Sequence, residues 1–184
     1  MKYFGLPFSK KDYVTMEIKV LNYLNFSLSV PTPINFLNRF LTETLASRRI
    51  ENFCLFFIEG ALYSDSVMYT FKPSEIAFTA FMLALRAESL FKDAQLPSKE
   101  KLYANQDEET FFFPKKLFEN VAKTTFEKER ILNCGRKIVR LLYSFLQRQC
   151  FLCQKFKEDK YDNVSRLFLE IFQKTNQQQN KLLF

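Results

Sequence analysis

The amino-acid sequence predicts an all-α protein, and three of its features support that prediction. Glycine is scarce, with 3 in 184 residues, whereas turn-rich β folds and phosphate-binding loops use more of it. Apolar residues make up 47% of the chain, and many of them recur at the three- and four-residue spacing of helix faces. Helix-start signals precede several of these apolar runs.

The first predicted helix runs from about Ser9 to Asn25, with Ser9 as its N-cap. Its apolar residues form more than a single stripe, so we expect the helix to be covered on most sides. An acidic residue and three leucines, spaced by 4, 3 and 4 residues, line up along this helix and its end: Glu17, Leu21, Leu24 and Leu28. Pro31 ends the segment.

Two further helices are predicted next. Thr32 followed by Pro33 is a strong start signal for the second helix. Its predicted inner face consists of four regularly spaced residues: Ile34, Leu37, Leu41 and Leu45. The third helix covers about residues 49–63, and a short turn through residues 65–69 follows it.

Pro73, Ser74 and Glu75 open the fourth helix, in which every residue from Ile76 to Leu85 is apolar except Thr79. A helix that is apolar all round belongs at the centre of a bundle. Residues 92–112 change to polar and charged types, so we interpret them as an exposed loop or insertion. The rings of residues 111–113 are expected to anchor that loop to the core.

The remaining part of the chain is predicted as a short helix at 115–123, a long helix and a final helix. Thr124 and Glu127 have capping-box spacing and start the long helix, which ends near Gln147. The apolar stretch 145–156 is also interpreted as helix. The final helix starts near Asn163, and residues 176–184 form a polar tail that is expected to fray.

The residue types that most catalytic sites need are missing. The chain has no histidine, which excludes histidine acid–base catalysis, histidine-activated nucleophiles and most catalytic zinc sites. Cys150 and Cys153 form a C-x-x-C that has no second copy to complete a zinc site, so buried free thiols in a reducing compartment are expected. Neither glycine-rich phosphate-binding motif is present. We expect no enzyme, no metal, no cofactor and no other small-molecule ligand.

The net charge of +7 comes from 27 Lys and Arg against 20 Asp and Glu, and it is spread along the chain. Because nucleic-acid binders usually concentrate basic residues on one face, most of this charge is expected to be solvated surface. No uncharged apolar run reaches the roughly 18 residues of a membrane span, and no signal-peptide core follows the N-terminus. We therefore expect neither nucleic acid nor membrane as a partner.

Four runs of the sequence resemble A- and B-type (mitotic) cyclins. Residues 16–28, M-E-I-K-V-L-N-Y-L-N-F-S-L, followed by P-T-P and F-L, are similar to the junction between the two cyclin folds of that family. Residues 73–85 resemble its P-S-x-I-A-x-A-A-F-x-L-A-L helix, and residues 50–65 resemble the first helical segment of its C-terminal fold. Residues 160–165, K-Y-D-N-V-S, are similar to a run near the C-terminus of the family.

The resemblance implies a fold: a cyclin-like five-helix C-terminal fold preceded by one extra helix of a truncated N-terminal cyclin fold. Residues 1–30 are then the remnant of the N-terminal fold. Residues 31–175 are the C-terminal fold, with the insertion at 92–112, and residues 176–184 are the polar tail. Most helices of the N-terminal fold and its substrate-docking patch are expected to be absent.

The resemblance also implies a function, that of a regulatory subunit that binds and activates a cyclin-dependent serine/threonine protein kinase in cell-cycle control, in the nucleus and cytoplasm. In this family the helix before the junction packs against the regulatory helix of the kinase through an acidic residue and leucines. The matching positions are Glu17, Leu21 and Leu28. An acidic group beside leucines suits an anchored contact whose register is fixed by charge.

Three alternatives remain open at this point. Leu21 and Leu28 could be core between two folds, with Glu17 simply solvated. The chain could be a cyclin-fold protein-interaction scaffold that does not activate a kinase, because most of the N-terminal fold is missing. A weaker alternative is nucleic-acid binding, given the pI of about 9.2, which requires steeply salt-dependent affinity for DNA.

Overall fold

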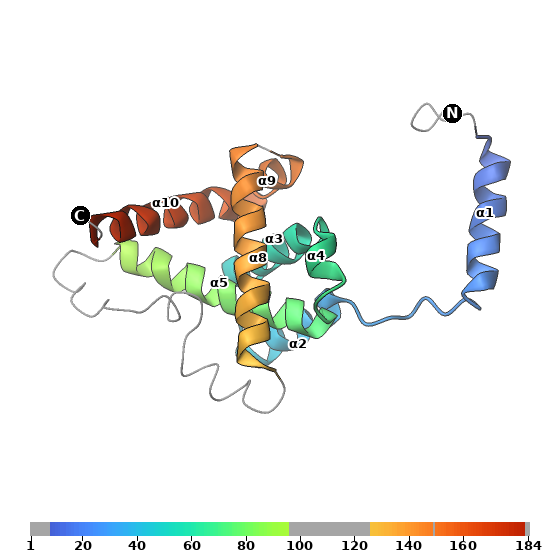
Figure 1. The fold of residues 1–184 in the computed structure, drawn as a ribbon, viewed down its shortest axis with the longest axis horizontal. Coiled ribbons are helices and arrows are strands. Elements are labelled where there is room, and N and C mark those ends of the chain that lie inside the picture. The colour runs from blue at the N-terminus through green and yellow to red at the C-terminus, as the bar shows by residue number, and fades with distance from the viewer. Residues whose placement is uncertain (1–7, 96–125, 149, 183–184) are drawn as a thin grey trace. The chain divides into compact units, whose positions relative to one another are not determined.

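The structure is a computed structural model that describes residues 8–95, 126–148 and 150–182, and these residues form helices and no strand. The chain divides into two compact units, Met1–Pro31 (unit 1) and Thr32–Phe184 (unit 2). The predicted all-α class is confirmed (Figure 1).

Unit 1 contains α1 (Lys10–Tyr23), whose start is fixed by a capping box. The Ser9 hydroxyl accepts the Asp12 N–H at 3.3 Å, and the Asp12 carboxylate accepts the Ser9 N–H at 2.7 Å. These reciprocal bonds satisfy donors that the first turn of a helix otherwise leaves free. The predicted N-cap at Ser9 is confirmed, and the C-cap is Leu24.

The described part of unit 2 is built from helices, and the connections from α2 to α5 and from α8 to α10 are short. Their bounds are α2 (Pro33–Thr44), α3 (Arg48–Leu62), α4 (Asp65–Met68), α5 (Pro73–Gln95), α8 (Lys128–Gln147), α9 (Phe151–Lys155), the 3₁₀ turn η3 (Asp159–Tyr161) and α10 (Val164–Leu182). The predicted starts at Pro33, Pro73 and near Asn163 agree with these bounds to within one residue.

The inner face of α2 is centred on Leu37, which is buried, with Leu41 packed against the same core. The prediction that Ile34 and Leu45 share this face is wrong. Ile34 is exposed, and Leu45 is the C-cap in the left-handed region (φ 48°), where it is 91% exposed. The helix ends before Leu45, so the side chain of Leu45 does not lie on the face that helical spacing predicts. Two aromatic residues of α2 pack on the core instead: Phe36 and Phe40.

α5 occupies the centre of unit 2, as predicted. Every residue from Ile76 to Ala84 is buried, and the helix packs against α2, α3, α8 and α10. In Figure 1, α8 crosses α5. A helix without a polar face needs neighbours on all sides, and these four helices supply them.

A cluster of phenylalanine rings joins α3 to the C-terminal helices. The Phe56 and Phe156 ring centroids are 5.4 Å apart, and those of Phe57 and Phe168 are 5.5 Å apart. Such edge-to-face and tilted pairs add to the free energy gained from burial alone. Because these residues are more than 90 positions apart in the sequence, the cluster fixes the C-terminal helices on the body of unit 2.

The stretch 145–156 is not one helix, so that prediction is wrong. α8 ends at Gln147, and α9 begins at Phe151 with Cys150 as its N-cap. The Cys150 N–H donates to the Phe145 carbonyl at 3.3 Å and closes the turn. No Pro or Gly marks this break, so the apolar pattern gave no sign of it. At the other end, α10 continues to Leu182, through most of the segment interpreted as a polar tail.

Several predictions fall outside the described residues. They are the helix at 115–123, the rings of residues 111–113, Thr124 of the capping box, and the insertion beyond its first four residues, which continue α5 to Gln95. Glu127, the predicted partner of Thr124, is the N-cap of α8.

α3 and α8 approach closely at Gly60. A Cβ placed on Gly60 would overlap the Cδ2 atom of Leu142, whose side chain is fully buried. Only the absence of a side chain at position 60 lets Leu142 pack against the α3 backbone.

Glu75 and Arg130 connect the start of α5 to α8. Nε and Nη2 of Arg130 donate to the two carboxylate oxygens of Glu75 at 2.8 and 2.9 Å, and the Lys72 N–H donates to Glu75 at 2.8 Å. The Glu75 side chain is only 8% exposed. The hydrogen bonds from Arg130 hold the pKa of Glu75 below its ordinary value of 4.5, although burial acts in the opposite direction.

We predict that Glu75→Gln lowers the free energy of unfolding at pH 7 by about 1–2 kcal/mol, since charge-assisted hydrogen bonds become neutral ones. The folded-state pKa is depressed, so this contribution is complete above the unfolded-state pKa and is lost as pH falls through the folded-state pKa. Urea titrations of both proteins should therefore begin to converge as pH falls below the ordinary glutamate pKa, and should coincide only below the depressed folded-state pKa of Glu75. Glu43→Gln, in the exposed Arg39–Glu43 pair, should show no such difference. Equal effects of the two changes would contradict this account.

We predict that Gly60→Ala destabilises unit 2 by about 1 kcal/mol, because overpacking outweighs the gain in helix propensity. In a Leu142→Ala background the same change should become neutral or stabilising, since the overlapping atom is gone. Thermal unfolding of the four proteins measures the coupling. Additive effects would show that Gly60 and Leu142 do not constrain each other.

Candidate functional site

α1 carries apolar side chains on several sides, yet unit 1 by itself buries none of its helical residues. Large hydrophobic side chains more than 40% exposed occur along the helix and its end: Tyr13, Val14, Met16, Ile18, Val20, Tyr23 and Leu24. The cover predicted for this helix is therefore not supplied by residues of its own unit. An apolar helix surface without cover is a typical site for a protein partner.

Glu17 and Leu21 lie one turn apart on the same side of α1, as the four-residue spacing predicts. Glu17 is exposed, and Leu21 is half-buried. The structure thus brings a charged group and an apolar group together on one helix face, the combination expected for an anchor beside a charged contact.

Leu28 is not part of the helix that carries Glu17 and Leu21, because the helix ends in a Schellman turn before reaching it. The Phe26 N–H donates to the Leu21 carbonyl at 2.9 Å, and the Asn25 N–H donates to the Asn22 carbonyl at 3.0 Å. Asn25 and Phe26 both have positive φ, 49° and 55°. Leu28 lies beyond the helix and is 59% exposed. Its position relative to Glu17 and Leu21 is set by this turn rather than by helical spacing.

The left-handed turn is a feature that the sequence analysis missed. Asn25 is a residue that adopts positive φ readily, so it could have been identified as a C-terminal signal. Phe26 gives no such indication, because an aromatic residue in this region is uncommon. The turn redirects the chain directly after the leucines, so it belongs to the candidate surface.

The start of the helix is also polar and ordered. Hydrogen bonds from the Ser9 hydroxyl and backbone lower the pKa of Asp12, so this carboxylate stays charged where it complements the positive end of the helix. Together, α1 and its terminal turn form the surface that we call the α1 face, defined by Glu17, Leu21, Leu24, Phe26 and Leu28.

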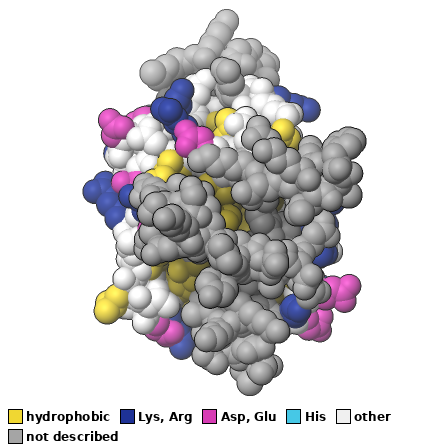
Figure 2. All heavy atoms as spheres, turned by 90° about the vertical axis from the view of Figure 1, so that its left-hand side faces the viewer, with side chains coloured by type: hydrophobic (Ala, Val, Ile, Leu, Met, Phe, Trp, Pro, Cys, Tyr) yellow, Lys and Arg dark blue, Asp and Glu magenta, His cyan; other side chains and the backbone are white. Residues whose placement is uncertain are grey.

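Unit 2 contains an apolar hollow between α3, α5, α8 and α10. Its lining is hydrophobic except for Arg86, and includes Leu83, Ala87, Leu90, Phe168 and Phe172. Figure 2 shows hydrophobic side chains reaching the surface of one face of the molecule, with acidic and basic side chains around them.

Within the described ranges, no three His, Cys, Asp or Glu side chains are grouped so that they could hold a metal ion. In the same residues, no helix has the length and hydrophobicity required to cross a membrane. Cys54 and Cys134 are buried, and burial raises both thiol pKa values, that of Cys134 to about 11. Such thiols are inert rather than nucleophilic.

Comparison with known proteins identifies one matching family model, the C-terminal domain of cyclins, over residues 31–170. G2/mitotic-specific cyclin-1 of Medicago sativa subsp. varia is 36% identical over 77 residues, which are 42% of this chain and 18% of that protein. Cyclin-A2-1 of Arabidopsis thaliana is 39% identical over 82 residues, with 42% and 18% covered. G2/mitotic-specific cyclin-B3 of Mus musculus is 32% identical over 83 residues, with 45% and 6% covered. The chain thus spans less than a fifth of the length of each of these relatives.

We predict that Ser9→Ala reduces the helical content of α1, since the first turn loses its side-chain acceptor. The Cα chemical shifts of residues 10–13 should move toward random-coil values. Those of α2 should not change, because its own N-cap bonds involve Thr32 and Asn35. Unchanged shifts in α1 would show that the capping box does not determine its helicity.

Proposed function

The chain belongs to the cyclin family through its C-terminal cyclin domain, and from this premise we propose that it is a regulatory subunit that binds and activates a cyclin-dependent serine/threonine protein kinase in cell-cycle control. The similarity to mitotic A- and B-type relatives supports a role in cell division. As a regulator the protein contributes no catalytic residue of its own, and it acts in the nucleus and cytoplasm.

The α1 face is the proposed kinase-binding surface, and its lack of cover within unit 1 is the observation that supports this most directly. Leu21 and Leu28 would pack against an apolar partner helix. Glu17 would meet a basic residue at the edge of that contact. A charged residue beside an apolar anchor fixes register and rejects wrong partners more than it adds affinity.

Activation follows if this contact is available only in the active conformation of the kinase. Moving a two-state equilibrium from 1:99 to 99:1 requires a preference of about 5.5 kcal/mol. Burying two leucine side chains supplies about 3–6 kcal/mol, before the cost of ordering them. Leu24 and Phe26, which are 43% and 65% exposed, would therefore need to contribute as well.

A second candidate function is a protein-interaction scaffold that uses the cyclin fold without activating a kinase. The apolar hollow of unit 2 favours it, because the half-buried side chains of Leu90 and Phe172 in its lining do not depend on α1. In this case partners would bind to unit 2, and changes in α1 would not affect them.

We predict that Glu17→Arg combined with Leu21→Ala reduces capture of a co-expressed cyclin-dependent kinase by the tagged chain at least tenfold. The loss of a buried leucine contact costs about 2 kcal/mol or more, and 1.4 kcal/mol corresponds to a factor of ten. Both replacement residues are good helix formers, so α1 should persist. Titration calorimetry or quantitative pull-down measures the change.

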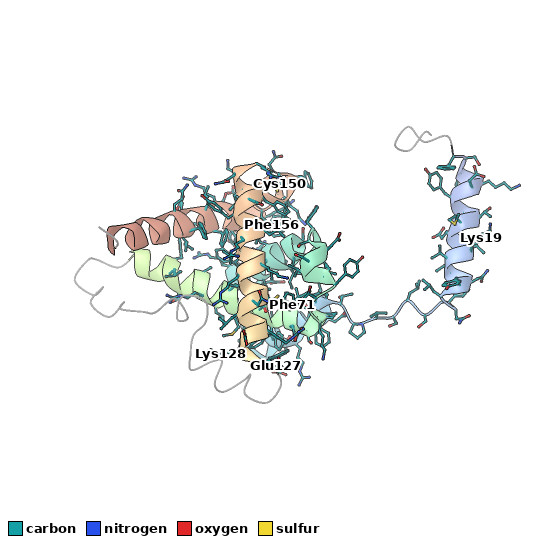
Figure 3. The ribbon with its side chains drawn as sticks, viewed as in Figure 1. Lys19, Phe71, Glu127, Lys128, Cys150 and Phe156 are labelled. Atoms are coloured by element: carbon teal, nitrogen blue, oxygen red, sulfur yellow. The ribbon has the colours of Figure 1, made fainter. Side chains whose placement is uncertain are left out.

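The matched control changes the opposite side of α1, with Thr15→Arg and Lys19→Ala (Figure 3 labels Lys19). This control should retain kinase binding. Equal loss in both variants, or undiminished binding of the Glu17/Leu21 variant, would contradict the proposed surface. Kinase capture without any increase in phosphoryl transfer would favour the scaffold function.

A further inference from the structure

Cys150 and Cys153 lie close together at the junction between α8 and α9, and their Sγ atoms are 3.4 Å apart. Cys150 is the N-cap of α9, and Cys153 is in its first turn. Figure 3 shows Cys150 near the end of α8, and Phe156 is the C-cap of α9. The N-cap position and the first turn of α9 hold the two thiols close, and a separation of three residues places side chains near each other in any helical turn.

Contacts with other parts of unit 2 hold this pair in place. The Ser165 hydroxyl donates to the Cys153 carbonyl at 2.8 Å in a buried bond, and the Ser165 N–H donates to the Phe156 carbonyl at 3.2 Å. Leu152 and Phe156 are buried on either side of Cys153. The short helix α9 is thus fixed by α10 and the core, so the distance between the two sulfur atoms is a property of the fold.

From this geometry we infer that Cys150 and Cys153 form a reversible dithiol–disulfide site, oxidised by small-molecule disulfides of the glutathione class. A closing movement of about 1.4 Å brings sulfur atoms at this distance to bond length. The other two cysteines, Cys54 and Cys134, are free and fully buried.

The two thiols have different accessibility, which orders the reaction. Cys150 is half-buried, whereas Cys153 is 6% exposed. Burial, together with the hydrogen bond to Cys150, raises the pKa of Cys153 to about 12. Cys153 is therefore protonated in the resting dithiol, and Cys150 is the sulfur that an external disulfide reaches first.

The exchange proceeds in two balanced steps. The Cys150 thiolate attacks one sulfur of oxidised glutathione, so a Cys150–glutathione disulfide forms and one glutathione thiolate leaves. Cys153 then loses its proton to solvent and attacks the Cys150 sulfur, which releases the second glutathione thiolate. Two thiols are oxidised and one glutathione disulfide is reduced.

The test measures the equilibrium between the full-length protein and glutathione redox buffers. After acid quenching, thiols are alkylated with one reagent, disulfides are reduced, and the released thiols are alkylated with a second reagent for peptide mass spectrometry. We expect a Cys150–Cys153 disulfide with Cys54 and Cys134 reduced. The equilibrium constant should be at least about tenfold higher in the folded protein than in the urea-unfolded chain, which corresponds to about 30 mV.

Single variants test the order of the steps. Cys153→Ser should accumulate a stable glutathione adduct on Cys150, whereas Cys150→Ser should form little adduct on Cys153. An equal or lower equilibrium constant in the folded protein would overturn the inference. So would pairing with Cys54 or Cys134, or the reverse pattern in the two variants. No kinase takes part in the measurement, so its outcome is independent of the proposed function.

Discussion

The burial of α5 on every side is the constraint around which unit 2 is arranged. No residue from Ile76 to Ala84 reaches solvent, so α2, α3, α8 and α10 must all find room against one helix. Alanines at positions 77, 80 and 84 keep its surface narrow enough for close approach. Where α5 begins, the carboxylate of Glu75 is paired with Arg130, because an unpaired charge next to such a core would be costly.

Local signals predicted the parts of this fold that depend on local chemistry. α1 begins where the Ser9 hydroxyl accepts the Asp12 N–H, and α2 and α5 begin at the fixed φ of Pro33 and Pro73. The apolar run of α5 predicted its central position. The outward turn of Leu45 and the break before Cys150 were not predicted, since both depend on where neighbouring elements lie. No residue within those stretches has a special backbone preference that reveals them.

The α1 face was likewise predicted only in part from local sequence signals. Helical periodicity was sufficient to place Glu17 and Leu21 on one face of α1, and the resemblance to mitotic cyclins, rather than any physical signal, suggested a kinase for that face. Helical spacing did not place Leu28 correctly, because Asn25 and Phe26 adopt left-handed conformations and their N–H groups donate to carbonyls of the last turn. For a phenylalanine this conformation is unfavourable by itself, so the sequence could not indicate it.

The missing cover on α1 has a thermodynamic consequence. A 14-residue helix that gains no burial within its own unit is only marginally stable in water, so part of any association energy is used to order the helix. The apparent dissociation constant then equals the intrinsic one divided by the helical fraction. The capping box and the Schellman turn, at opposite ends of α1, therefore influence the helical fraction and, through it, the apparent dissociation constant. Sequence changes at Ser9 or Asn25 would alter partner affinity without altering a side chain of the α1 face.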